Sequence, residues 1–136
     1  MENNDKFEVV LLGIVYDPEK RKILIGKKAK DESIPKISWC FPGGRLLPGE
    51  SIDKTLKSKI KEKTGYDVKN LGTIFSQRYP ENPHMISIYF LCEIFDGEEK
   101  PGGSFVETKW VDPEEIENYF TTEFNTRLRE YILNLR

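Results

Sequence analysis

The stretch from Gly44 to Tyr66, GRLLPGESIDKTLKSKIKEKTGY, constrains the fold more than any other part of the chain. Apolar side chains recur in it at intervals of four, which predicts one buried stripe along an amphipathic helix. The residues of this stripe are Ile52, Leu56 and Ile60. Ser51 is a suitable N-cap, and Gly65 suits the left-handed turn that ends many helices. We therefore predict a helix over residues 51–64.

Strand-like segments flank this helix on both sides. Two apolar runs, residues 7–16 and 22–28, predict a hairpin whose first strand is buried on both faces. In residues 84–95 apolar and more polar side chains alternate, which predicts a half-buried strand. The alternating apolar residues are Ile86, Ile88, Phe90, Cys92 and Ile94. Shorter strands are predicted within residues 38–44, 68–79 and 105–111.

The C-terminal part is predicted to be helical. Asp112 and Pro113 open one helix, because proline is favoured in the first turn. A last helix, from about Glu123 to Leu135, carries apolar residues at helical spacing. The order of strands, one central helix, strands and then helices predicts an α/β or α+β sandwich with a mixed sheet.

Length and composition limit the classes of protein to consider. The chain has 136 residues, which predicts a single domain over residues 1–136. Its net charge of -2 gives no general attraction to long nucleic acid or to a membrane surface. The chain has no run of 18 apolar residues, and MENNDK lacks the features of a signal peptide, so we expect a cytoplasmic protein. Cys40 and Cys92 are expected to be reduced, buried thiols.

The glycines before the helix indicate a loop that comes close to a ligand. Gly43 and Gly44, with Gly49 before Glu50, allow sharp bends and close backbone approach. Amides just before a helix N-terminus favour an anion such as a phosphate. Glycine-rich turns before helices are also common in purely structural roles, so the loop alone is a weak signal.

The spacing of the whole segment resembles that of the Nudix hydrolases. Their signature is G-x5-E-x7-R-E-U-x-E-E-x-G-U, where U is a bulky apolar residue. Residues 44–66, hereafter the box, have this length without a gap, and five positions match by identity or class. The matching residues are Gly44, Glu50, Ile60, Glu62 and Gly65. WCFPGG before the box and VETKWVDPEEI after it also resemble the family. The resemblance implies a Nudix-like α/β/α sandwich.

Three residues of the box depart from the signature. Ser58 replaces the arginine, and Lys59 and Lys63 replace two of the three glutamates. In the family these glutamates bind divalent cations that bridge a substrate diphosphate, because Mg²⁺ prefers oxygen ligands. An ammonium group only donates hydrogen bonds and cannot take that role. The charge summed over positions 59, 62 and 63 is +1, where three glutamates would give -3.

The resemblance leaves several functions open. In the first, the protein hydrolyses the diphosphate of a nucleoside diphosphate linked to another moiety, but weakly. The catalytic residues would then be Glu62, Glu50 and Arg45, and Gly43 and Gly44 would place the phosphates. Mg²⁺ or Mn²⁺ would be bound weakly by Glu62 and Glu50, with a carboxylate from elsewhere. The candidates for that carboxylate are Glu98, Glu99 and, by its match to the family, Glu107.

In the second, Lys59 and Lys63 bind the ligand phosphates directly, and the protein is a nucleotide-binding or sensing module with little hydrolysis. In the third, the two lysines are solvated helix residues without a role. In the fourth, the protein resembles the GDP-mannose mannosyl hydrolases and cleaves the sugar carbon–oxygen bond of a GDP-sugar. This alternative rests on Arg45, because those enzymes also have an altered box and an arginine after the two glycines. In each functional case the partner is a nucleotide-type small molecule, and a homodimer stays open.

Other residues that attract attention have ordinary structural explanations. His84, the only histidine, follows a proline in a polar loop and is expected to be exposed. Trp39 and Trp110 could stack on a base, but their strand contexts favour core packing. Arg78 and Tyr79 end a predicted strand and could contact a ligand or belong to a plain surface loop.

Overall fold

Seven strands and three helical segments make up the described part of the protein. The computed structural model describes residues 6–29, 39–79, 82–120 and 124–136. The strands are β1 Glu8–Asp17, β2 Lys22–Lys28, β3 Trp39–Cys40, β4 Gly43–Leu46, β5 Tyr66–Arg78, β6 Met85–Gly97 and β7 Phe105–Val111. The helical segments are α1 Ile52–Thr64, the 3₁₀ helix η1 Pro113–Asn118 and α2 Thr126–Leu133.

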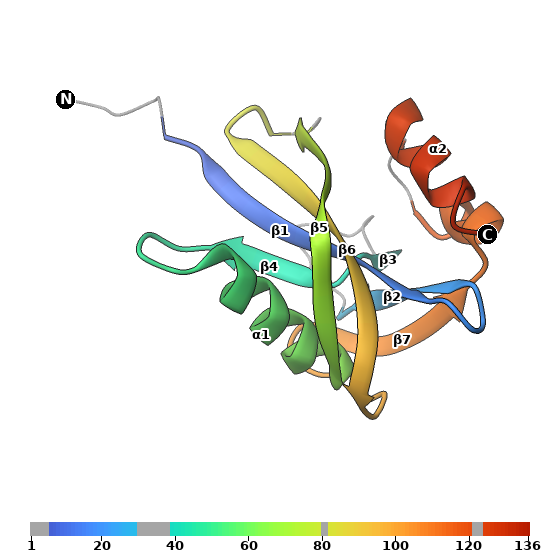
Figure 1. Ribbon diagram of the computed structural model, residues 1–136. Coiled ribbons are helices and arrows are strands. Elements are labelled where there is room, and N and C mark those ends of the chain that lie inside the picture. The colour runs from blue at the N-terminus through green and yellow to red at the C-terminus, as the bar shows by residue number, and fades with distance from the viewer. Residues whose placement is uncertain (1–5, 30–38, 80–81, 121–123) are drawn as a thin grey trace.

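The strands form one mixed sheet, as predicted (Figure 1). The order along its main path is β3-β2-β1-β6-β5, with β4 paired to β1 and β7 to β2. β1 and β6 are parallel, whereas the other pairs are antiparallel. Along one edge β1 pairs with β6. Along its other edge β1 pairs with two strands, Val9–Leu12 with β4 and Val15–Asp17 with β2. The Gly13 amide lies between these two pairings and donates to the Pro42 carbonyl at 2.8 Å.

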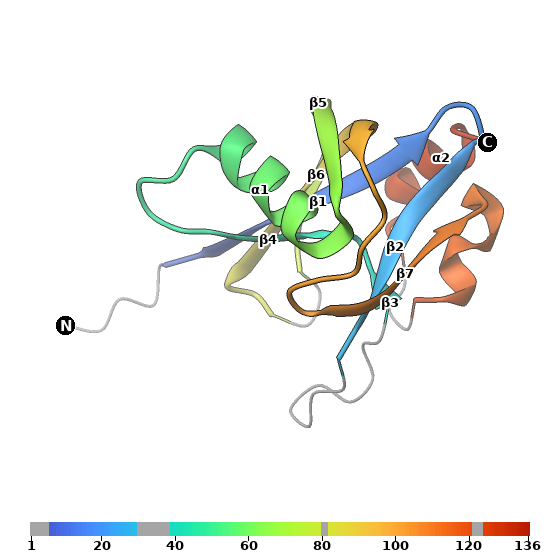
Figure 2. The same ribbon diagram turned by 90° about the horizontal axis from the view of Figure 1, so that it is seen from below.

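Helices cover both faces of the sheet, which confirms the α/β/α sandwich (Figures 1 and 2). On one face α1 packs Leu56 and Ile60 against the strands. On the other, η1 and α2 contribute Ile116, Leu128 and Ile132. β1 supplies side chains to both layers, among them Leu11 and Ile14, both with 0% exposure. Its predicted burial on both faces is therefore confirmed.

The two C-terminal segments differ in detail from the prediction. Pro113–Asn118 is a short 3₁₀ helix rather than an α-helix. The last helix begins at Thr126, later than predicted, because the Asn125 side chain accepts a hydrogen bond from the Arg127 amide at 2.9 Å and caps it. The predicted start, residue 123, lies outside the described residues. An aromatic cluster around Phe41 joins this part to the sheet through Tyr89 and Phe120.

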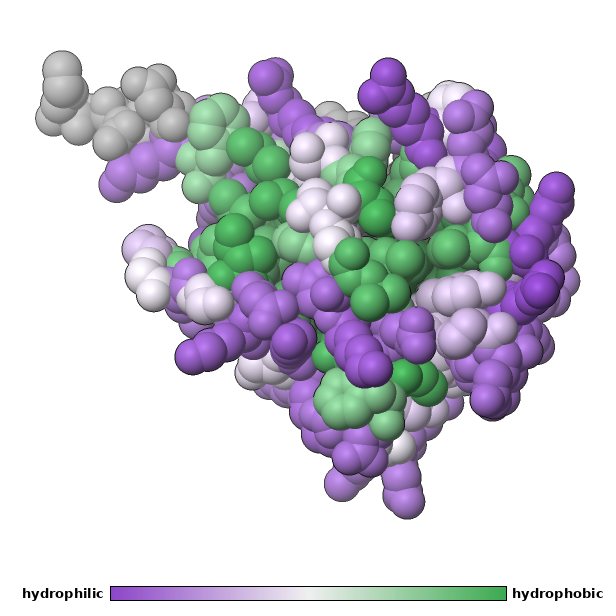
Figure 3. Space-filling view, viewed as in Figure 1, coloured by the Kyte–Doolittle hydropathy of each residue, from purple (hydrophilic) through white to green (hydrophobic). Residues whose placement is uncertain are grey.

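The surface seen in Figure 3 has two regions of different character. Apolar side chains gather in a band over the strands, and hydrophilic ones cover α1 below it. The outer side of α1 is therefore a charged surface. Among the described residues no helix is both long and apolar enough to cross a membrane.

Candidate functional site

Helix α1 holds the box residues in place through its caps and its buried stripe. The Ser51 side chain accepts from the Lys54 amide at 3.3 Å, and Gly65 adopts the left-handed conformation with φ 83°. Both predicted caps are confirmed. The helix lies so close to β1 that a Cβ added to Gly13 would be 2.6 Å from Ile60 Cδ1. Positions 59, 62 and 63 are thus fixed relative to the sheet.

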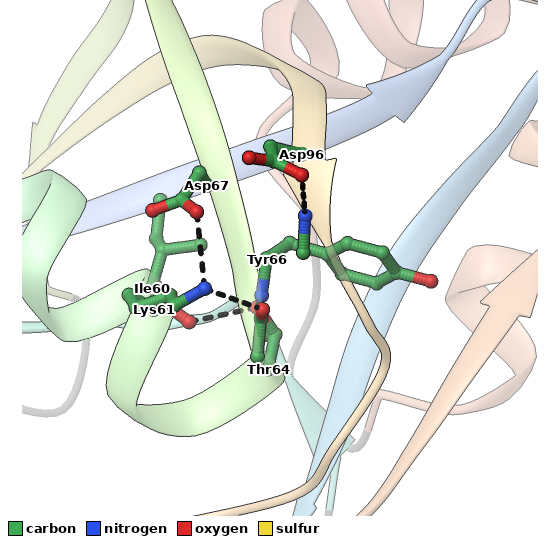
Figure 4. A network of polar contacts seen from close by, with 8 residues as sticks. Ile60, Lys61, Thr64, Tyr66, Asp67 and Asp96 are labelled. Carbon is green, nitrogen blue, oxygen red and sulfur yellow. Dashed lines mark hydrogen bonds and ion pairs between the residues drawn. The ribbon is translucent and has the colours of Figure 1, made fainter.

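A polar network closes the C-terminal end of α1 (Figure 4). The Lys61 ammonium donates to the Gly65 carbonyl at 3.1 Å and pairs with Asp67 at 3.0 Å. The Thr64 hydroxyl donates to the Ile60 carbonyl at 2.7 Å and accepts from the Tyr66 amide at 3.2 Å. These contacts turn the chain directly from the helix into β5.

Lys63 points inward, toward β4. Its ammonium donates a hydrogen bond to the Gly43 carbonyl, with Nζ and O 2.5 Å apart, and lies 5.5 Å from the centre of the Phe105 ring. Burial lowers the pKa of Lys63 below its ordinary value, and the nearby Cys40 thiol opposes this shift. None of the ion pairs found among the described residues involves Lys63.

Lys59, one turn earlier, is placed differently. Its stem packs over Gly44, where an added Cβ would lie 2.9 Å from Lys59 Cγ and Cδ. Its ammonium is 3.9 Å from Glu62 Oε2, and both side chains are largely exposed, at 41% and 53%. Lys59 therefore presents its charge to solvent beside Glu62, and the pair is a weak surface ion pair.

The two glycines expected in a phosphate loop lie in strand β4. Gly43 pairs with Leu12 and Gly44 with Leu11 of β1. The chain needs glycine at position 43, because an added Cβ would be 1.9 Å from the Leu11 carbonyl oxygen. The predicted loop is thus corrected: it follows β4, and its left-handed residue is Gly49, with φ 85°.

Glu50 and Arg45 each have a hydrogen-bond partner within the protein. The Glu50 carboxylate accepts from the Leu47 amide at 2.8 Å, and the Glu50 amide donates to the Leu47 carbonyl at 3.1 Å. Glu50 thus closes the turn before α1. Arg45, exposed on β4, pairs with Glu8 at 2.9 Å.

Glu107 lies on the other face of the sheet from α1. It shares a face of β7 with Lys109, because side chains alternate along a strand, and Lys109 lies over the Tyr119 ring at 5.0 Å. Tyr119 packs in the η1 and α2 layer. The structure therefore does not bring Glu107 to Glu62.

The described side chains do not fit a cluster of divalent metal ions. Glu62 faces Lys59, Glu50 closes its own turn and Glu107 lies on the opposite face. No group of three or more His, Cys, Asp or Glu within the described ranges is arranged to hold a metal ion. Lys63 adds a positive charge at a position where a metal ligand would have to supply an oxygen lone pair.

The segment between β6 and β7, residues 98–104, packs on the last turn of α1. The Lys100 amide donates to the Thr64 carbonyl at 2.8 Å, and the Gly102 amide donates to the Lys63 carbonyl at 3.1 Å. These bonds satisfy carbonyls that a helix end leaves free. The sequence indicated only a loop here, because nothing local shows which helix it meets.

Glu99 anchors this segment through three hydrogen bonds. Its carboxylate accepts from the Thr108 hydroxyl at 2.7 Å, from Trp110 Nε1 at 3.1 Å and from the Tyr66 hydroxyl at 3.5 Å. Glu98 and Glu99 both line a hollow of about 480 Å³ between the segment and α1, together with Glu62.

The remaining residues have the structural roles that their sequence contexts indicated. His84 is exposed, Trp39 packs on Tyr119 and Trp110 packs on Tyr66. Both cysteines are free thiols; Cys92 is buried as predicted, whereas Cys40 is only half-buried. Burial raises the pKa of the Cys92 thiol to about 12 and also raises that of Cys40.

Two curated proteins are similar to this chain in sequence. A curated ADP-ribose pyrophosphatase of Methanocaldococcus jannaschii is 34% identical over 95 residues, which are 67% of this chain and 54% of that protein. The "Nucleoside diphosphate-linked moiety X motif 6" protein of Mus musculus is 33% identical over 90 residues, 64% of this chain and 28% of that one. The chain thus spans about half or less of these two relatives.

Solved structures share the fold. A NUDIX hydrolase from Nitrosomonas europaea superposes with a TM-score of 0.77 at 18% identity, covering 96% of this chain and 72% of that one. A MutT structure described for Aliivibrio salmonicida and Vibrio cholerae gives a TM-score of 0.72 at 20% identity, covering 93% and 96%. The family model described as "NUDIX domain" matches residues 6–135. With nearly its whole length matched, the chain belongs to the NUDIX domain family.

Proposed function

We propose that this protein acts on the diphosphate of a nucleoside diphosphate linked to another moiety, and that its hydrolysis is weak. The observation that carries the proposal is the placement of Lys59 and Glu62 on the exposed side of α1, beside β4 and the loop that follows it. The exposed Lys59 ammonium makes only a weak surface pair with Glu62, so it can also bind a phosphate oxygen. The names of the Methanocaldococcus jannaschii and mouse relatives support a ligand of this class.

The weakness of the hydrolysis follows from the missing oxygen ligands. We propose that Mg²⁺ or Mn²⁺ binds weakly, because Glu62 is paired with Lys59 and Glu50 is hydrogen-bonded within its turn. The neighbouring ammonium groups also oppose the approach of a divalent cation. What the chain itself supplies is a positively charged place for the diphosphate, positioned by α1 and β4.

The test is turnover on nucleoside triphosphates, dinucleotides, ADP-ribose and GDP-sugars with Mg²⁺ or Mn²⁺. The native protein is compared with the Lys59→Glu, Lys63→Glu double variant, which restores the carboxylates of the signature. We expect weak turnover that rises at least about tenfold in the variant, because two oxygen ligands for a divalent cation are restored. Strong native turnover, unchanged or reduced in the variant, would contradict the proposal.

A matched control and the products sharpen this test. Lys54→Glu makes half of this charge change on the same helix, about 180° around it from Lys63, and should leave turnover unchanged. With a GDP-sugar, cleavage of the diphosphate yields GMP, whereas cleavage of the sugar bond yields GDP. GDP as the product would favour the mannosyl hydrolase reading that rests on Arg45.

A second candidate is a nucleotide-binding or sensing module without turnover. The contact of Lys63 with Gly43 favours it, because that contact gives the box an internal positive charge. A ligand that binds only the folded protein raises the melting temperature by mass action. A thermal-shift screen of the same nucleotides in EDTA tests this candidate, and the absence of any shift would count against it.

A further inference from the structure

The contact between Lys63 and Gly43 joins two segments that are 20 residues apart in the chain. The ammonium ties the last turn of α1 to the first residue of β4. It also lies over the Phe105 ring, so that β7 closes the same contact from a third side. A flexible side chain held by three elements has a defined position rather than a range of solvated ones.

The surroundings of this ammonium are those of a bound cation. The ammonium contacts a backbone carbonyl oxygen and the face of an aromatic ring. Glu62, the acidic residue just before Lys63, pairs with Lys59 and not with Lys63. If position 63 carried a carboxylate, that group and the Gly43 carbonyl would both present oxygen atoms to this point, and a separate cation would be needed between them.

We propose that the Lys63 ammonium occupies the cation position of the box, so that the joint between α1 and β4 is built without a metal ion. The NUDIX family generally uses divalent metal ions, and the residues that the structure describes do not fit such a cluster. The inference concerns the same site as the proposed function, but it rests on the packing of the free protein and not on turnover.

Thermal unfolding of the full chain tests the inference. The native protein, Lys63→Met and Lys63→Glu are each melted in EDTA and in increasing Mg²⁺ or Mn²⁺. Methionine keeps most of the stem and removes the charge. We expect the native protein to respond to the metal only weakly, far less than Lys63→Glu. Lys63→Met should melt about 5 °C lower, with a metal response no larger than that of the native protein.

Lys63→Glu is the informative variant. We expect its melting temperature to rise with Mn²⁺ or Mg²⁺ in a saturable manner, because its carboxylate and the Gly43 carbonyl can then share a metal ion. Lys59→Glu is the matched control, one turn away on the exposed side, and should show a clearly smaller rise. An equal rise in both variants would show a surface charge effect and overturn the inference.

Two other results would also overturn it. One is a native protein that divalent metal stabilises as much as it stabilises Lys63→Glu. The other is a Lys63→Glu variant that folds but shows no metal response. Because unfolding is the readout, a failed turnover assay leaves this test intact, and a failed metal response leaves the turnover assay to be judged by itself.

Discussion

At the scale of single residues, glycine is favoured at positions 43 and 44 of β4 for two different physical reasons. Position 43 has no room for a side chain, because the backbone of β1 lies directly against it, 1.9 Å from an added Cβ. Position 44 faces the stem of Lys59, which is flexible and can move. One glycine therefore serves the pairing of two strands, and the other makes room for a charged side chain of α1.

Gly43→Ala should destabilise the protein much more than Gly44→Ala. We expect about 3 kcal/mol or more for the first, because backbone must shift, and about 1 kcal/mol for the second. Urea denaturation of both variants gives the comparison. Equal losses of unfolding free energy would mean that β4 adjusts to a methyl group at position 43.

At the scale of elements, residues 98–104 support the box helix from its C-terminal end. Their amides bind the carbonyls of Lys63 and Thr64, and Glu99 fixes the segment to β7 and Tyr66. An added Cβ at Gly102 would lie 2.4 Å from the Glu62 carbonyl oxygen, so the segment and α1 are in close contact. The orientation of the last helical turn, with Glu62 and Lys63, thus depends on a loop far away in the sequence.

Glu99→Ala should loosen this support. The carboxylate is partly solvated, so we expect a loss of about 1–2 kcal/mol and hydrogen exchange of the Lys100 and Gly102 amides that is roughly tenfold faster. Glu98→Ala is the matched control, because it removes a neighbouring carboxylate of the same hollow and leaves the three hydrogen bonds of Glu99 in place. Unchanged exchange in Glu99→Ala would show that the backbone contacts hold the segment without its carboxylate.

At the scale of the whole molecule, one sheet separates two apolar layers. Leu56 belongs to the α1 layer and Leu128 to the α2 layer, and both are buried, with exposures of 0% and 2%. β1 lies between the layers and contributes to each. Because both layers share this strand, they should unfold together.

Leu56→Ala and Leu128→Ala should each cost about 2–5 kcal/mol, and the costs should add in the double variant. Denaturation followed by both tryptophan fluorescence and circular dichroism measures this, and the two probes should give one common transition. Leu71→Ala, at a side chain with 53% exposure, is the control and should change little. Two separate transitions would show that the layers fold independently.

The sequence by itself determined the helix α1, its caps and the register of the box. These depend on residues close together in the chain, because capping and helical periodicity are local. The replacement of acidic residues at positions 59 and 63 was also visible, since charge is a property of the residue. The sequence did not determine where each of these charged side chains lies in the fold or which group it contacts.

Only the tertiary structure decided that Lys63 binds the Gly43 carbonyl while Lys59 faces solvent. It also placed Glu107 away from the box and Glu99 among three hydrogen-bond donors. These positions follow from strand register and from the packing of distant segments, which no local pattern specifies. The box of this protein is thus recognisable from spacing, but its internal cation is a product of the fold.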